Sequence, residues 1–376
     1  MNTMSAALTD PRDPQLLTDS GACQARNDPG KPTAVADSRA SKALTDSWAL
    51  GGVALENRVV LAPLAGIGNW FVRLQAKRYG AGLAVSEMVS SFAVHHRNER
   101  TCRELLRIHP EEHPVAVQLF GHDPDVMESA SECVAAAGAD LIDLNMGCPV
   151  PKVCKTGAGA ALLAEPQRAI ALARAAARGS GLPVTVKLRS GWSPGDERGI
   201  ELARRLADEG SVAGLCIHPR HASQRHSGVP DYGLARALVD ELPIPVLISG
   251  GLRTAEQARA AFEQTGAAGI LLARGSLGNP WLFEQLLGIR VAEPDAHEIL
   301  AELDWVIDRA SEHLGARRAA RYLRKFYPWY LQRLGGGAAL QAALQTAPTL
   351  GAVREILRGA KWDDGAAPAS TRTSSQ

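Results

Sequence analysis

Leu141-Ile142-Asp143-Leu144-Asn145-Met146-Gly147-Cys148-Pro149 is the stretch around which the rest of this sequence is organised. Its first half is a short apolar run ending in a polar residue, which is typical of a buried parallel strand. Its second half is a tight turn with a cysteine directly before a proline, and proline restricts the backbone of both residues. Cys148 is therefore held in a defined place. Many cysteines are simply buried, so other parts of the chain must decide between a structural and a catalytic thiol.

The same cycle of strand, loop and helix recurs along the chain on both sides of this stretch. Short apolar runs predict further strands over residues 59–63, 83–87, 115–119, 184–188, 214–218, 245–249 and 269–273. Eight such units predict an α/β fold, a parallel (β/α)₈ TIM barrel, with a doubly wound open sheet as the main rival. Polar residues at the strand ends favour the barrel, whose strand ends converge on one mouth. These residues are Glu87, Gln118, Asn145, Lys187, His218 and Ser249.

Composition divides the chain into four expected regions. Residues 1–46 are rich in Asp, Pro, Ser, Thr and Ala, and we expect a disordered tail because such a segment buries little apolar surface. The barrel is expected over residues 47–290, followed by a small all-helical domain over 291–362 and a second disordered tail over 363–376. Within the helical domain, helix breaks are expected at Gly315, residues 335–337 and Pro348.

Bulk properties narrow the class of protein. The chain has 376 residues, a formal net charge of +1 and six cysteines. The cysteines form no CxxC pair and no zinc-ligand spacing, which favours reduced thiols over a disulfide framework or a metal site. No apolar run reaches membrane-spanning length, and no secretory or transit signal is evident. We expect a cytoplasmic enzyme that acts as a monomer without metal.

Glycine-rich turns follow the seventh and eighth predicted strands. Glycines there let backbone N–H groups approach an anion, and this is the standard phosphate position of a TIM barrel. No GxGxxG fingerprint follows an early strand, so a mononucleotide cofactor or a phosphorylated substrate is expected in place of a dinucleotide. The candidate phosphate residues are Ser249, Gly250, Gly251, Ala273, Arg274 and Gly275.

Three polar side chains at strand ends are candidates for contact with a ring. Lys187 could stabilise a developing anion such as a reduced flavin. Gln118 offers both a donor and an acceptor to the edge of a flavin or pyrimidine. His218, close to Arg220, is as well suited to a phosphate or ring contact as to a purely structural place.

The segment from Arg317 to Arg333 contains six basic residues and no acidic one. Arg317, Arg321 and the pair Arg324 and Lys325 recur at helical spacing and are expected to share a face, with aromatic residues between the basic ones. Taken alone, this pattern indicates a solvated charged face over an aromatic core. If the substrate is RNA, a helix that grips phosphates becomes the better interpretation.

Together these residues resemble the tRNA-dihydrouridine synthases, and the bacterial B-type branch is the most similar. The resemblance runs from about Trp48 to at least Leu331. It rests on Ala62-Pro63-Leu64-Ala65-Gly66, Val85-Ser86-Glu87-Met88, Asn145-Met146-Gly147-Cys148-Pro149 with Lys152-Val153, Ile217-His218, and Gly278-Asn279-Pro280-Trp281-Leu282-Phe283.

The resemblance implies an enzyme that binds FMN in the barrel and reduces the C5=C6 bond of uridine in the tRNA D-loop, with NADPH as reductant. Reduced FMN would give a hydride to C6 of uracil, and a thiol, mostly protonated at neutral pH, would give the proton to C5. The target uridine would be flipped out of the folded RNA to reach the flavin. By position, Cys148 resembles the proton donor and Asn145 a uracil contact. Further assignments implied are Pro63, Gln118, Lys187, His218 and the two glycine turns for FMN, and Arg220, Arg321, Arg324 and Lys325 for tRNA.

Two other functions remain open from the sequence. A different FMN barrel enzyme, such as a dihydroorotate dehydrogenase or an ene-reductase, would share the cofactor site but would have no use for a basic helical domain. A tRNA-binding protein that has lost catalysis would not need Cys148, Asn145 and Lys187.

Overall fold

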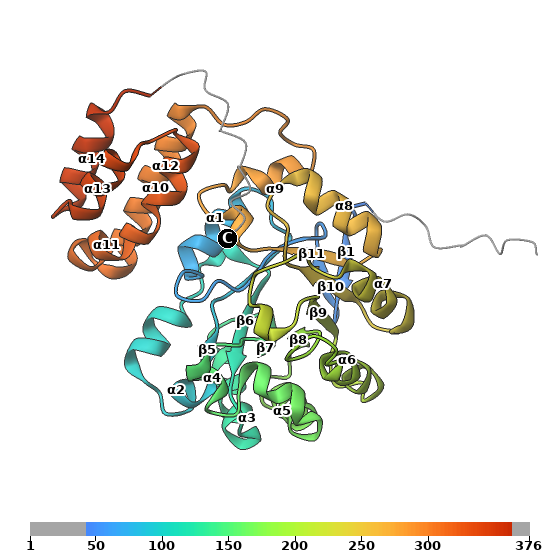
Figure 1. Cartoon of the computed structure of the whole chain (residues 1–376). Helices are drawn as coiled ribbons and strands as arrows, with labels where there is room; N and C mark the ends of the chain where they lie inside the picture. Colours follow the sequence, from blue (N-terminus) through green and yellow to red (C-terminus); the bar gives the residue numbers. More distant parts are fainter. Residues whose placement is uncertain (1–42, 363–376) are drawn as a thin grey trace, which may run out of the picture. The chain divides into compact units, whose positions relative to one another are not determined.

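The computed structural model describes residues 43–362 (Figure 1). Apart from its last four residues, the disordered tail expected over 1–46 lies outside the described part, and so does the tail expected over 363–376. Ordered chain begins before the expected boundary at 47. Leu44 is buried, and its carbonyl accepts a hydrogen bond from the backbone N–H of Arg58.

Eight parallel strands close into a barrel, which confirms the predicted fold class. Each strand pairs with the next, and the pairing of the last with the first and of β4 with β6 completes the ring. The strands are β3 (Val59–Leu61), β4 (Leu83–Val85), β6 (Val115–Phe120), β7 (Leu141–Met146), β8 (Val184–Arg189), β9 (Gly214–His218), β10 (Val246–Ser249) and β11 (Gly269–Leu272).

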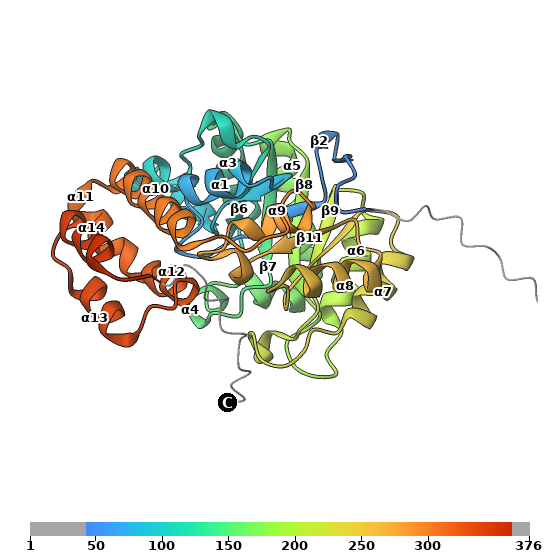
Figure 2. The same cartoon turned by 90° about the horizontal axis from the view of Figure 1, so that it is seen from above.

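Helices follow most strands and cover the outside of the barrel (Figures 1 and 2). They begin and end at residues whose chemistry suits those places. Thr254 caps α8 by accepting the N–H of Gln257, and Gly266 ends that helix in the left-handed conformation. The covering helices are α1 (Trp70–Arg78), α3 (Pro124–Ala136), α5 (Pro166–Ser180), α6 (Arg198–Asp208), α7 (Tyr232–Glu241), α8 (Ala255–Thr265) and α9 (Trp281–Leu286).

Two short features were not expected from the sequence. An antiparallel hairpin of β1 (Trp48–Leu50) and β2 (Val53–Leu55) precedes the barrel. Its Leu50 and Leu55 are buried together with the apolar residues inside the barrel, such as Leu83 and Leu141. The hairpin therefore closes one end of the barrel.

The second unexpected feature lies in the link after β4, where β5 (Val89–Ser90) pairs with the end of β6. It leads into α2 (Ser91–His95) and two short irregular helical turns at Thr101–Leu105 and Pro110–Glu112.

The C-terminal part of the described chain is all helical and lies beside the barrel next to α1 (Figures 1 and 2). Three of its breaks occur at the predicted places, and a fourth, at the 3₁₀ turn Leu323–Lys325, was not predicted. The helices are α10 (Ala296–Leu314), α11 (Ala316–Tyr322), α12 (Tyr327–Arg333), α13 (Ala338–Thr346) and α14 (Leu350–Gly359). No helix within residues 43–362 has the length and apolar character that crossing a bilayer requires.

Buried polar contacts join this helical region to the barrel. The carboxylate of Glu302 on α10 accepts a hydrogen bond from Gln75 Nε2 at 2.8 Å and another from the Tyr79 hydroxyl at 2.7 Å. Gln75 also donates to the Tyr330 hydroxyl of α12 at 3.0 Å. The division into a barrel over 47–290 and a separate helical domain over 291–362 stays a prediction.

Candidate active site

The polar residues predicted at the strand ends come together at one mouth of the barrel. Asn145 on β7 lies opposite Lys187 on β8, and Asn145 Nδ2 donates to Gln118 Oε1 at 2.9 Å. Lys187 Nζ donates to Ser249 Oγ of β10 at 3.1 Å. Because these four side chains come from different strands of a rigid sheet, they form a fixed set of donors and acceptors.

Cys148 lies directly beyond the end of β7, in a loop that Asn145 holds. Asn145 Oδ1 accepts the backbone N–H of Cys148 at 2.9 Å and that of Gly147 at 3.3 Å. The Cys148 carbonyl accepts the Cys154 thiol at 3.3 Å. Cys148 is a free cysteine and is only partly buried.

Arg189, which the sequence analysis did not select, ties the Cys148 loop to the loop after β9. Its guanidinium donates to the carbonyls of Gly147 at 3.0 Å, His221 at 3.1 Å and Arg225 at 2.7 Å. Burial, with a smaller contribution from nearby Arg220, lowers the pKa of Arg189 to about 10, so it stays protonated at neutral pH. This buried cation fixes the backbone immediately before Cys148.

The two predicted phosphate turns pack against each other. Gly250 has φ +99°, and a Cβ at this position would overlap the ring of His218. A Cβ at Gly275 in the second turn would overlap the carbonyl of Leu252 in the first. Only glycine permits this approach of backbone to backbone. Gly250, Gly251 and Gly275 are each partly exposed, so the backbone of both turns reaches the surface.

Positive charge gathers beside these turns. Arg220 is buried and its Nε has no partner among the described residues. Burial lowers the pKa of Arg220, and the positive charges of Arg274 and Arg253 lower it further. Burial and neighbouring cations also lower the pKa of His218, whose Nε2 lies 3.1 Å from an Arg220 nitrogen, and bring that of His226 to about 4. Such a cluster attracts an anion.

Pro63 and Ala273 lie at the same mouth, immediately after β3 and β11. The structure thus brings together the residues proposed for a ring and a phosphate. Their role as ligands remains a prediction.

A groove of about 740 Å³ separates the barrel rim from α10 and α11. We call it the rim groove. Its charged lining residues are Glu87, Arg100, Glu104, Arg318, Arg321 and Lys325. Arg318 and Arg100 pair with Glu104 and lower the pKa of that carboxyl to about 2, whereas burial raises the pKa of Glu87. The lining residues of the groove therefore carry a net positive charge.

The basic residues predicted to share one helical face are not all in this groove. Arg321 and Lys325 line it, and Lys325 donates to the Gly66 carbonyl of the barrel. Arg324 is not among the lining residues. A 3₁₀ turn over Leu323–Lys325 interrupts the regular α-helix. The rotation of 100° per residue that would place Arg324 on the same face as Arg321 therefore does not continue past Tyr322. A tRNA contact for each of the three remains a prediction.

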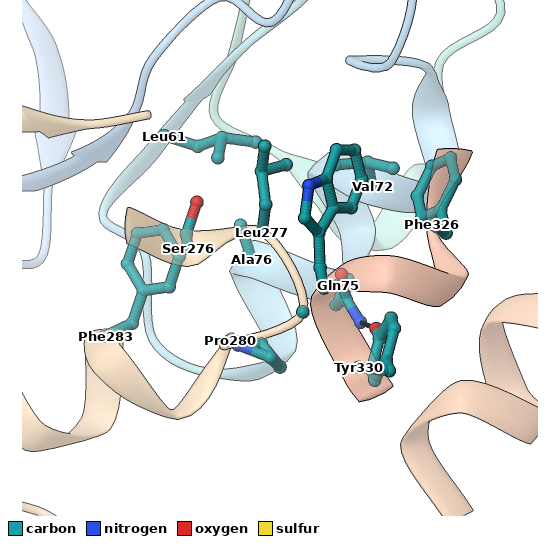
Figure 3. A pocket seen from close by; sticks show the side chains of 12 residues that line it. Leu61, Val72, Gln75, Ala76, Ser276, Leu277, Pro280, Phe283, Phe326 and Tyr330 are labelled. Atoms are coloured by element: carbon teal, nitrogen blue, oxygen red, sulfur yellow. Dashed lines mark hydrogen bonds between the residues drawn. The ribbon is translucent and has the colours of Figure 1, made fainter. Parts of the chain in front are cut away.

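A second cavity, between the barrel and the helical region, is too small for a ligand. It measures about 10 Å³, roughly enough for one water molecule. Figure 3 shows Val72, Leu277 and Phe326 around it, with the hydrogen bond from Gln75 to Tyr330 at its edge. This cavity belongs to the packing of the two regions.

Two buried charged residues near the site were not selected from the sequence, although a periodic signal existed. Side chains two residues apart on a strand face the same side of the sheet. Asp143 precedes Asn145 by two residues, and Arg189 follows Lys187 by two. Applying that alternation to the predicted strands would have placed Asp143 inside the barrel and Arg189 at its mouth.

Comparison with known proteins identifies relatives over most of the chain. A family model described as dihydrouridine synthase matches residues 60–360. The chain is 34% identical to tRNA-dihydrouridine synthase B of Pseudomonas putida, a match covering 78% of this chain and 88% of that protein. It is 35% identical to tRNA-dihydrouridine synthase B of Pasteurella multocida, covering 75% and 86%.

Solved structures with the same fold are much more distant in sequence. A morphinone reductase aligns with a TM-score of 0.50 at 17% identity, over 70% of this chain and 94% of that chain. A 2-naphthoyl-CoA reductase aligns with a TM-score of 0.53 at 13% identity, over 66% and 52%. These likenesses concern the barrel fold alone.

Proposed function

This chain belongs to the dihydrouridine synthase family and is an oxidoreductase that reduces uridine in tRNA; on that premise we propose that FMN at the barrel mouth carries the hydride and Cys148 gives the proton. The observation that carries the proposal is that the thiol, the strand-end amides and the cationic glycine turns lie at one mouth. NADPH as the electron source and a cytoplasmic location are part of the same proposal.

The residues present at the mouth fit FMN. Gly250 and Gly275 are partly exposed and lie in turns next to Arg220 and Arg274, whose mutual repulsion a phosphate would relieve. Gln118 and Lys187 would contact the ring, with Pro63 and His218 beside it. When bound and reduced, FMN supplies the hydride that C6 of uracil receives.

Cys148 would protonate C5 of the uracil. The loop that carries it is fixed from two sides, by the Asn145 amide and by the Arg189 guanidinium. Fixing the thiol removes the entropic cost of finding the reacting carbon.

tRNA would be held by the rim groove. A flipped uridine needs its flanking backbone gripped, and positive side chains serve this purpose because they bind phosphates without regard to sequence. Arg321 offers a guanidinium with no carboxylate partner among residues 43–362, and Lys325 lies next to it on the barrel side. This groove favours a tRNA substrate over a small-molecule one.

The test is dihydrouridine formation in unmodified tRNA by the FMN-loaded protein with NADPH. Cys148→Ala should keep FMN and still accept electrons from NADPH, but its single-turnover rate with tRNA should fall by about 10² to 10⁴, as is usual for loss of a general acid.

Cys154→Ala is the matched control, since this second thiol of the loop contacts backbone groups such as the Cys148 carbonyl and has no proposed part in proton transfer. It should retain most of the rate. A colourless protein that gains no flavin absorbance would contradict the FMN proposal. Dihydrouridine formed at the wild-type rate by Cys148→Ala would assign the proton to another group.

A further inference from the structure

A continuous chain of hydrogen bonds runs through the barrel interior from β8 to the Cys148 loop. Thr185 Oγ1 donates to Asp143 Oδ1 at 2.7 Å, and Gln118 Nε2 donates to Asp143 Oδ2 at 2.6 Å. Asn145 Nδ2 then donates to Gln118 Oε1, and Asn145 Oδ1 accepts the N–H of Cys148. The chain connects a buried carboxyl to the loop with the thiol.

The direction of this chain is fixed at both ends. An ionised carboxylate can only accept hydrogen bonds, and a backbone N–H can only donate them. Gln118 must therefore turn its NH₂ group to Asp143 and its carbonyl to Asn145. Asn145 in turn must present its carbonyl to the Cys148 loop, which leaves only N–H for the mouth.

Protonation of Asp143 would remove the constraint at its own end of the chain. A carboxylic acid can donate as well as accept, so it could satisfy Gln118 in the opposite orientation. A reversed Gln118 would point its NH₂ group at the NH₂ group of Asn145. Asn145 would then have to turn over, and its carbonyl would leave the backbone N–H of Cys148.

Asp143 is placed so that its charge state can change. The side chain is buried, and burial is the main cause that raises its pKa to about 6, against the opposing hydrogen bonds of Thr185 and Gln118. The titratable groups that face it are Lys187 of β8, which lowers its pKa, and Cys216 of β9. Burial raises the pKa of Cys216 to about 11, so that thiol is neutral.

We propose that Asp143 is a positioning residue whose ionised carboxylate sets the orientation of the Gln118 and Asn145 amides, and through them the Cys148 loop, so that the enzyme is competent only when Asp143 is deprotonated. The inference rests on the proposed function, because it assigns that loop the proton-donating thiol. Asp143 itself touches neither reactant.

The first measurement does not depend on activity. In the FMN-loaded protein without tRNA, an infrared band of a protonated carboxylic acid should appear as the pH falls through about 6. Asp143→Asn should lack this band. Thr185→Val, which keeps the side-chain shape but removes a hydrogen bond that lowers the pKa, should show the band at higher pH.

The second measurement is the single-turnover rate of the pre-reduced enzyme with tRNA between pH 5 and 8.5. Wild type should lose rate below pH about 6. Asp143→Asn should be about 10- to 100-fold slower at pH 7.5, because the thiol is misplaced. We call the fall in the wild-type rate below pH about 6 the acidic limb; the rate of Asp143→Asn should not change across it. Thr185→Val should match wild type at high pH with the limb moved to higher pH, and tRNA affinity should stay unchanged in both.

Asp140→Asn, at the other end of the same strand, is the control and should keep the wild-type limb. A wild-type rate and limb in Asp143→Asn, or an unmoved limb in Thr185→Val, overturns the inference. If Asp143→Asn does not fold, Thr185→Val decides alone. A wild-type protein that forms no dihydrouridine at any pH contradicts the proposed function instead.

Discussion

At the scale of single residues, Asp143 also makes the fold sensitive to pH. Its pKa is about 6 in the folded protein, raised by burial, and about 3.9 in an unfolded chain. The folded state therefore takes up the proton first, and wild type gains stability as the pH falls through 6. Relative to Asp143→Asn, wild type should gain about 1 kcal/mol between pH 7.5 and pH 5. Urea unfolding at the two pH values measures this; an unchanged difference between the proteins would show that Asp143 stays ionised in the folded protein down to pH 5.

Gly250 gives a second prediction at this scale. Gly250→Ala would place a methyl group against His218 and close to an Arg220 nitrogen, so FMN affinity should fall at least about tenfold from this clash. Gly138→Ala is a matched control, because Gly138 has a similar φ of +97° but open space around it. Both variants carry the strain of alanine in the left-handed region. Only Gly250→Ala should bind FMN more weakly when the affinity is measured by fluorescence titration. An equal loss of affinity in both variants would assign the effect to backbone strain and not to the clash with His218.

At the scale of elements, the regular strands were predictable and the short irregular ones were not. β7 and β8 read as apolar runs because a strand inside a covered barrel is buried on both faces. β1 and β2 have three residues each, too few for any periodic signal, and they become ordered only by burying Leu50 and Leu55 inside the barrel. The site could likewise be predicted only where its residues are close together in the sequence. Cys148 and Asn145 were evident from the turn that ends β7, whereas the structural role of Arg189 depends on carbonyls from a distant loop.

The rim groove allows a prediction about α11. Arg321→Ala should weaken tRNA binding. The log of the association constant should also fall less steeply with the log of the salt concentration, the slope being smaller in magnitude by about one, as expected for one lost phosphate contact. Arg205→Ala on α6 removes the same charge from an exposed position outside the groove and should leave both unchanged. Filter binding at several salt concentrations measures this. Equal effects of the two variants would mean that tRNA responds only to total charge.

At the scale of the whole molecule, the helical region is joined to the barrel by specific polar contacts as well as by apolar packing. The Tyr322 hydroxyl of α11 accepts from Asn69 Nδ2 at 2.6 Å, and Glu302 of α10 is held by Gln75 and Tyr79 of α1. Buried polar contacts of this kind are lost together when the two parts separate. The rim groove therefore lies between two parts of the molecule that these contacts hold together.

The hairpin of β1 and β2 has a consequence for the order of the reaction. Because it closes one end of the barrel, the nicotinamide of the proposed reductant NADPH and the uracil of tRNA would use the same entrance in turn. The kinetics should be of the ping-pong type: initial-rate plots against NADPH at several tRNA concentrations should be parallel, and tRNA at high concentration should compete with NADPH. Intersecting lines would require both substrates to occupy the enzyme at once.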